Sequence, residues 1–135
     1  MHELELDVAD DACTLRLDGR VLARLDGGAE ALLSGAGERL RELDIEVAIE
    51  RSEEWLMPSS RLLQGLELKV RDATGRMRSM LGASASFTLA EVEQAFARAH
   101  DAVAHGRPVS RGGVADVVLL RELAHHGRLS RILLA

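Results

Sequence analysis

The sequence predicts a single α+β domain over residues 1–135, with a mainly antiparallel sheet of about six strands and about three helices packed mostly on one face of it. Three observations predict this class. Several short segments alternate apolar and charged residues with a period of two, as half-buried strands do. Tight-turn dipeptides such as Asp18 and Gly19 join neighbouring segments. Three other segments have apolar residues at helical spacing instead.

The first half of the chain is expected to run strand, strand, strand, helix, strand. In the opening meander, Leu4 and Leu6 alternate with Glu3 and Glu5, which places one face of the strand on a core. The next elements follow from the same reasoning on period and turn residues. The expected strands are 4–8, 14–18, 20–25 and 44–50, and the expected helix is 29–43.

The second half is expected to run strand, strand, helix, helix. Residues 66–71 and 76–81 alternate on either side of a turn-like segment and predict a second hairpin. Thr88 and Glu91 form a capping box, which starts a helix over 88–105. The segments left are a last helix over 110–126, an irregular stretch at 51–65, and a tail at 129–135 that reads as a strand or a frayed helical turn.

Charge and composition exclude several classes of function. The chain has 17 basic and 22 acidic side chains, a net charge of −5, and only 2% aromatic residues. A general nucleic-acid binder needs a basic excess and stacking aromatics, so the composition argues against nucleic acid as a partner. No apolar run approaches the roughly 20 residues of a membrane helix, and no secretory leader is recognisable, so we expect a cytoplasmic protein without a membrane partner. The one cysteine, Cys13, is expected to be a buried structural thiol.

The charged faces of the strands also suggest which strands are neighbours. Glu46 and Glu50 would lie opposite Lys69 and Arg71, because opposite charges on adjacent strands stabilise their pairing. We therefore expect strand 44–50 beside strand 66–71.

The sequence predicts no catalytic residue, no metal site and no cofactor. His100 and His105 are five residues apart and fall on different helical faces, while His125 and His126 are adjacent and diverge. A weak anion site is expected at the start of the last helix, where backbone amides and a cationic side chain meet. It would consist of Ser110, Arg111, Gly112 and Gly113.

Two apolar groups are candidate protein-binding surfaces. One lies in the irregular stretch, and the other is the stripe of helix 88–105, which could equally face the core. Their residues are Trp55, Leu56, Met57, Leu89, Val92, Phe96 and Val103.

The interpretation favoured by these features is a small acidic protein-interaction or regulatory adaptor that binds another protein or a second copy of itself as a homodimer. One alternative is a small-ligand-binding protein or small enzyme with a pocket between sheet and helices. A further alternative is a nucleic-acid binder that uses the basic hairpin 66–81.

Overall fold

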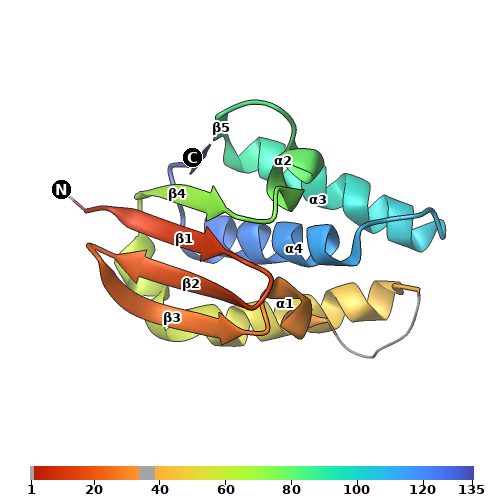
Figure 1. Ribbon diagram of the computed structural model, residues 1–135, viewed down its shortest axis with the longest axis horizontal. Coiled ribbons are helices and arrows are strands. Elements are labelled where there is room, and N and C mark those ends of the chain that lie inside the picture. The colour runs from red at the N-terminus through yellow and green to blue at the C-terminus, as the bar shows by residue number, and fades with distance from the viewer. Residues whose placement is uncertain (1, 34–38) are drawn as a thin grey trace.

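One mixed sheet carries the described strands, in the order β3-β2-β1-β4-β6-β5 (Figure 1). The computed structural model describes residues 2–33 and 39–135. Strand β1 pairs antiparallel with β2 but parallel with β4, and β4 pairs parallel with β6. The strands are β1 (Leu4–Val8), β2 (Ala12–Leu17), β3 (Arg20–Asp26), β4 (Glu67–Asp72), β5 (Ser86–Phe87) and β6 (Arg131–Leu134). The α+β class is confirmed, whereas the expectation of a mainly antiparallel sheet is corrected to a mixed one.

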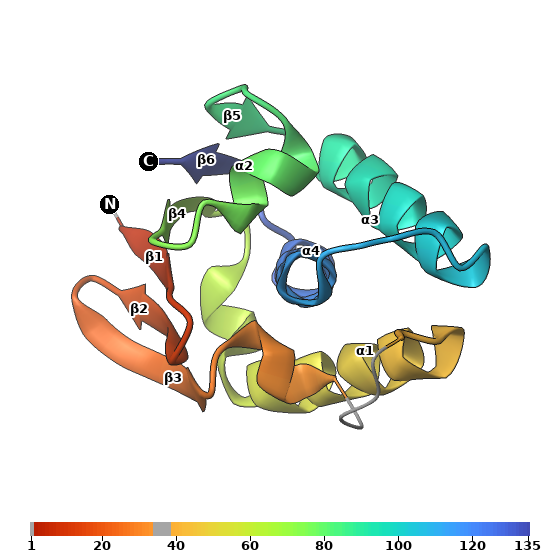
Figure 2. The ribbon, with the colours of Figure 1, turned by 45° about the vertical axis from the view of Figure 1, so that its right-hand side comes forward.

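The helices lie on one side of this sheet (Figure 2). The α4 helix packs at the centre, flanked by α1 and α3, and twelve of its sixteen residues are buried. The described residues form four α-helices and two 3-10 helices, not about three helices. They are η1 (Ala29–Leu32), α1 (Glu42–Leu56), η2 (Met57–Leu63), α2 (Arg76–Leu81), α3 (Leu89–Ala104) and α4 (Arg111–His126). None of these helices combines the length and the apolar character that crossing a bilayer requires.

The N-terminal meander is confirmed. Asp18 and Gly19 both take positive φ angles, 51° and 81°, which is the conformation that a tight primed hairpin turn needs. On the face toward the helices, Leu6 lies between Leu15 of β2 and Val70 of β4, and none of the three has exposed surface. The alternation of the sequence therefore does mark the core face of the sheet.

The expected strand at 44–50 is wrong, because these residues belong to α1. The buried positions Ile45, Ala48, Ser52 and Leu56 recur every three or four residues, which is helical spacing. The Asp44 carboxylate accepts a 2.8 Å hydrogen bond from the backbone N–H of Arg41 and so fixes where the helix starts. The apparent alternation rested on three apolar residues, too few to separate a period of two from one of 3.6.

The expected helix over 29–43 is wrong as well. Residues 29–32 form only the 3-10 helix η1, and α1 begins at Glu42. Residues 34–38, in the middle of the expected helix, lie outside the described residues.

The expected hairpin over 66–81 is half right. Its first strand is β4, but the chain then turns into α2 and does not form a second strand. Asp72 causes the change, since its carboxylate accepts hydrogen bonds from the backbone N–H groups of Thr74 and Met77. Gly75 follows with a φ of 77° and begins the helix. The basic hairpin proposed for nucleic acid is therefore not formed.

The charged outer face of the sheet supports the parallel pairing of β1 with β4. Arg71 Nε lies 3.0 Å from Oε2 of Glu5, and Arg16 pairs with Asp7. The neighbours of strand 66–71 are thus β1 and β6, and the expected pairing with residues 44–50 is wrong. The two later helices are confirmed to within one residue at each end, and the C-terminal tail forms β6.

Candidate functional site

The carboxyl ends of β1 and β4 meet at one edge of the sheet, beside the start of α4 (Figure 1). In open sheets with parallel strands, this edge is where ligands most often bind. Here it holds the β1–β2 turn with Asp10, the β4–α2 loop that follows Asp72, and the α4 N-terminus at Arg111.

Arg76 bridges this edge. Its Nε donates to Oδ2 of Asp116 over 2.8 Å, and its Nη1 donates to Oδ1 of Asp10 over 2.7 Å. Asp116 has no exposed surface, whereas Asp10 is largely exposed. Burial raises the pKa of Asp116 above its ordinary value, and the hydrogen bond and charge of Arg76 oppose that rise. The Arg76 side chain therefore links α2, where it is the first residue, to both the β1–β2 turn and α4.

The two glycines of the expected anion site allow α2 side chains to pack closely against α4. A Cβ on Gly112 would lie 2.8 Å from Cζ and Nε of Arg76, and a Cβ on Gly113 would lie 2.9 Å from Sδ of Met80. The Ser110 hydroxyl accepts the N–H of Gly113 at 3.0 Å and caps α4. Arg111, the cationic member of the expected anion site, lines a pocket.

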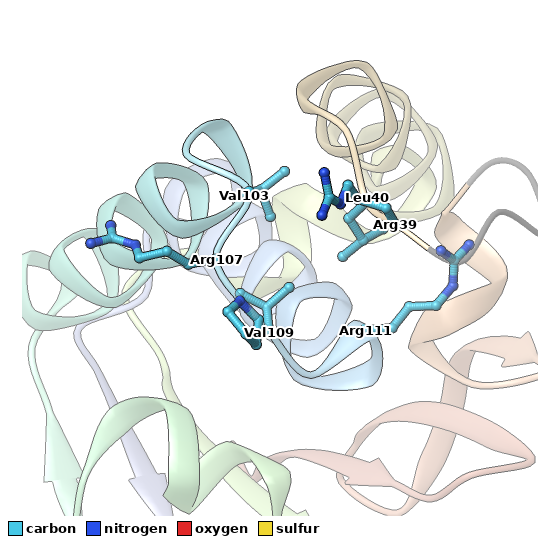
Figure 3. A pocket seen from close by; sticks show the side chains of 8 residues that line it. Arg39, Leu40, Val103, Arg107, Val109 and Arg111 are labelled. Atoms are coloured by element: carbon cyan, nitrogen blue, oxygen red, sulfur yellow. The ribbon is translucent and has the colours of Figure 1, made fainter.

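That pocket, here called the arginine pocket, has a volume of about 230 Å³ and lies where the ends of α1, α3 and α4 approach each other (Figure 3). Arg111 comes from the start of α4, and Arg39 from the segment before α1. Leu40, Val103 and Val109 supply apolar walls. It is lined by Arg39, Leu40, Val103, Gly106, Arg107, Pro108, Val109 and Arg111.

The loop after α3 brings its part of this wall into place. Gly106 takes a φ of 65°, which ends the helix and turns the chain. Arg107, just after this turn, pairs with Asp101, and Figure 3 shows its guanidinium group turned away from those of Arg39 and Arg111. Arg39 forms no ion pair with any residue of 2–33 or 39–135. The cations that line the pocket are thus Arg39, Arg111 and the more distant Arg107.

Most of the residues expected to bind a protein partner are buried or half-buried. Leu56, Val92 and Val103 are buried, and Trp55, Leu89 and Phe96 are half-buried against the core. Met57 is the exception, with 67% of its surface exposed. These positions do not form a continuous exposed surface.

The histidines are placed differently from one another. His105 Nδ1 lies 3.1 Å from Oδ1 of Asp101 at the end of α3. His126 lies near Glu122, four residues before it on α4, and near Glu53 of α1. This last group was not expected from the sequence, although the spacing of four residues between Glu122 and His126 places both on the same side of a helix.

No protein-family model matches the sequence, and no curated protein matches it. Solved structures do match. An exopolyphosphatase from Cytophaga hutchinsonii aligns with a TM-score of 0.69 and 12% identity over 98% of this chain and 52% of its own. The fold of this chain is similar to that of about half of this exopolyphosphatase chain.

Two Aquifex aeolicus structures agree with this result. A Ppx/GppA family member has a TM-score of 0.63 and 9% identity, and a type II variant of the Ppx/GppA phosphatase has a TM-score of 0.65 and 8% identity. Both matches cover 99% of this chain and about half of the other chain, 52% and 53%. At these identities the likeness is one of fold.

The comparison corrects the interpretation that the sequence favoured. These structures are named as Ppx/GppA proteins, among them a phosphatase, and as an exopolyphosphatase. This finding contradicts the adaptor interpretation. The small-ligand alternative agrees better with the fold. Its pocket, however, lies between helix ends and not between the sheet and the helices.

Proposed function

We propose that this chain binds a small phosphate-bearing anion in the arginine pocket. The observation that carries the proposal is the lining itself. Three arginines line it, and no acidic residue of the described ranges 2–33 and 39–135 does, although the whole chain has a net charge of −5. A local reversal of charge at a concave site is what an anionic ligand requires.

Arginine suits phosphate in particular. The guanidinium group is planar, remains charged, and can form two parallel hydrogen bonds to phosphate oxygens. Arg111 also stands in the first turn of α4, where the helix dipole adds positive potential. The volume of about 230 Å³ lies below the roughly 300–1,000 Å³ of typical drug-sized sites, which favours a compact ligand such as an inorganic phosphate chain.

The comparison supports the same chemistry. One of the matching structures is named an exopolyphosphatase, so its substrate class is polyphosphate. We infer that the ligand of this chain belongs to the same class of condensed phosphates. The proposal concerns binding, and it rests on the arginine pocket of this chain.

Calorimetric titration with sodium tripolyphosphate tests the proposal. We expect one binding site, and we expect Arg39→Gln and Arg111→Gln each to weaken binding at least about tenfold, since each removes a charge-assisted hydrogen bond. Arg20→Gln is the matched control. Arg20 is exposed in the β2–β3 hairpin, and its replacement makes the same change in net charge.

The control decides between a site and a general charge effect. If Arg20→Gln weakens binding as much as Arg111→Gln, or if the wild-type protein does not bind tripolyphosphate, the proposal fails. Circular dichroism of each variant shows that the compared proteins are folded.

A further inference from the structure

A second group of side chains lies at the opposite end of α4 from the arginine pocket. Glu122 and His126 stand one turn apart on α4, and Glu53 reaches them from α1. One donor atom of each residue lies within 4.8 Å of the other two. The group joins the C-terminal parts of two helices that pack side by side (Figure 2).

One nitrogen faces both carboxylates. His126 Nε2 lies 3.3 Å from Oε1 of Glu53 and 3.4 Å from Oε1 of Glu122. An imidazole nitrogen carries at most one hydrogen, so it cannot donate a good hydrogen bond to both oxygens. Both distances also exceed the usual 2.7–3.2 Å of an N–H···O hydrogen bond. Direct hydrogen bonds from His126 Nε2 therefore do not account for the position of both carboxylates.

The same distances suit a shared metal ion. Ligands about 2.0–2.1 Å from a tetrahedral zinc ion are separated from each other by about 3.3 Å. The two nitrogen–oxygen distances are close to this edge length. Imidazole together with carboxylate oxygens is a donor set used by zinc and related divalent ions.

A neighbouring arginine fixes the orientation of the buried carboxylate. Arg121 Nη1 donates to Oε2 of Glu122 over 3.2 Å, which leaves Oε1 directed to His126. Arg121 is itself held by two hydrogen bonds to Glu93, of 2.9 and 3.1 Å, and its guanidinium carbon lies 4.3 Å from the centre of the Phe96 ring. Such outer partners orient metal ligands in known sites.

The net charge of the surrounding side chains and a neighbouring cavity are both consistent with a bound cation. Glu53, Glu93 and Glu122 with Arg121 leave two net negative charges when His126 is neutral, and a divalent ion would cancel them. A cavity of about 50 Å³ borders Glu53 and His126. This is room for a water molecule, whose share of liquid volume is about 30 Å³, as a fourth ligand.

We propose that Glu53, Glu122 and His126 bind a divalent transition-metal ion that links α1 to α4. The site is separate from the arginine pocket, so either proposal can fail without the other. His126 and Glu53 are exposed by 38% and 40%, which gives the ion a route from solvent, while Glu122 is buried.

The test is a calorimetric titration of the full chain with Zn²⁺ after removal of bound metal with a chelator. We expect one equivalent to bind. His126→Gln and Glu53→Gln are each expected to weaken binding at least tenfold. His125→Gln is the matched control, because it removes the adjacent imidazole, which is not part of the group of donors.

Two results would overturn the proposal: equal affinity in the wild type and in His126→Gln, or an equal loss in His125→Gln and His126→Gln. A second measurement does not depend on affinity alone. Zn²⁺ should raise the thermal unfolding midpoint of the wild type and of His125→Gln, and should not raise that of His126→Gln. An equal rise in all three proteins would mean that zinc binds elsewhere.

Discussion

Arg76 and Asp116 are 40 residues apart in the sequence and joined by hydrogen bonds of 2.8 and 3.4 Å. Asp116 lies on the buried face of α4, and Arg76 is the first residue of α2. The pair therefore holds the start of α4, and with it Arg111, in a defined position relative to the sheet.

Removal of Arg76 should destabilise the protein strongly. Arg76→Ala leaves the Asp116 carboxylate buried without its partner, and such changes cost about 3–5 kcal/mol. Arg131→Ala is the control, because its pair with Glu67 is exposed and such pairs contribute less than about 1 kcal/mol. Urea unfolding measures both. An equal loss in the free energy of unfolding of the two variants would show that Arg76 stabilises the protein no more than an exposed ion pair does.

Gly112→Ala should also destabilise the protein, by about 1–3 kcal/mol, although alanine favours helix more than glycine does. The new methyl group would lie 2.8 Å from the guanidinium group of Arg76 and push it off Asp116. The loss should shrink in an Arg76→Ala background, since residues in contact are not additive. If Gly112→Ala costs as much free energy of unfolding in the Arg76→Ala background as in wild type, the new methyl group does not clash with Arg76.

The Cys13 thiol should be inert in the folded protein. It has no exposed surface, and burial raises its pKa to about 11, with the charge of Asp116 adding to the rise. At pH 8 the reactive thiolate is therefore scarce as well as inaccessible. A chromogenic disulfide reagent should label the thiol in denaturant and not in buffer, and rapid labelling in buffer would contradict this.

Glu122 should make stability depend on pH. Burial, assisted by Glu53, raises the pKa of Glu122 above its ordinary value of 4.5, against the opposing charges of Arg121 and His126. As the pH rises above 4.5, the unfolded chain loses this proton before the folded chain does, so the free energy of unfolding falls.

Glu122→Gln removes that dependence. With chelator present, the variant should gain stability relative to wild type as the pH rises from 4.5 through the raised pKa. Urea unfolding across this range measures the difference. If the difference in free energy of unfolding between Glu122→Gln and wild type does not change with pH, or falls as the pH rises, the pKa of Glu122 is not raised by folding.

Asp101→Asn should strengthen binding of tripolyphosphate several-fold. Asp101 holds Arg107 and His105 and brings a negative charge near the rim of the arginine pocket. The amide would remove that charge and release Arg107 toward the ligand. Asp26→Asn is the control, since Asp26 pairs with Arg24 on a distant strand. Equal effects of the two changes would show a general response to net charge.

Local signals in the sequence were enough for part of the fold. Asp18 and Gly19 determine a turn by their own backbone preferences, and the Thr88–Glu91 capping box determines the start of α3. The α1 helix was missed because the three alternating apolar residues in 44–50 are too few to separate a period of two from one of 3.6. Ser52, a polar residue on the buried face, further obscures the helical spacing.

The sites depend on contacts between distant residues. Arg39 and Arg111 line one pocket because α1 and α4 pack together, and the sequence around either residue does not indicate the other. Arg111 was a candidate because it opens a helix, whereas Arg39 had no local signal. Glu122 and His126 could have been paired from their spacing, but Glu53 could not.

The central claim is that a condensed phosphate binds in the arginine pocket. Two-dimensional ¹H–¹⁵N spectra of the labelled protein, recorded as tripolyphosphate is added, test it most directly, because each backbone amide reports its own surroundings. The account predicts the largest shifts at Leu40, Gly106, Val109 and Arg111, which line the pocket. Shifts concentrated on Lys69 and Arg71 of the outer sheet face, or no shifts at all, would contradict it.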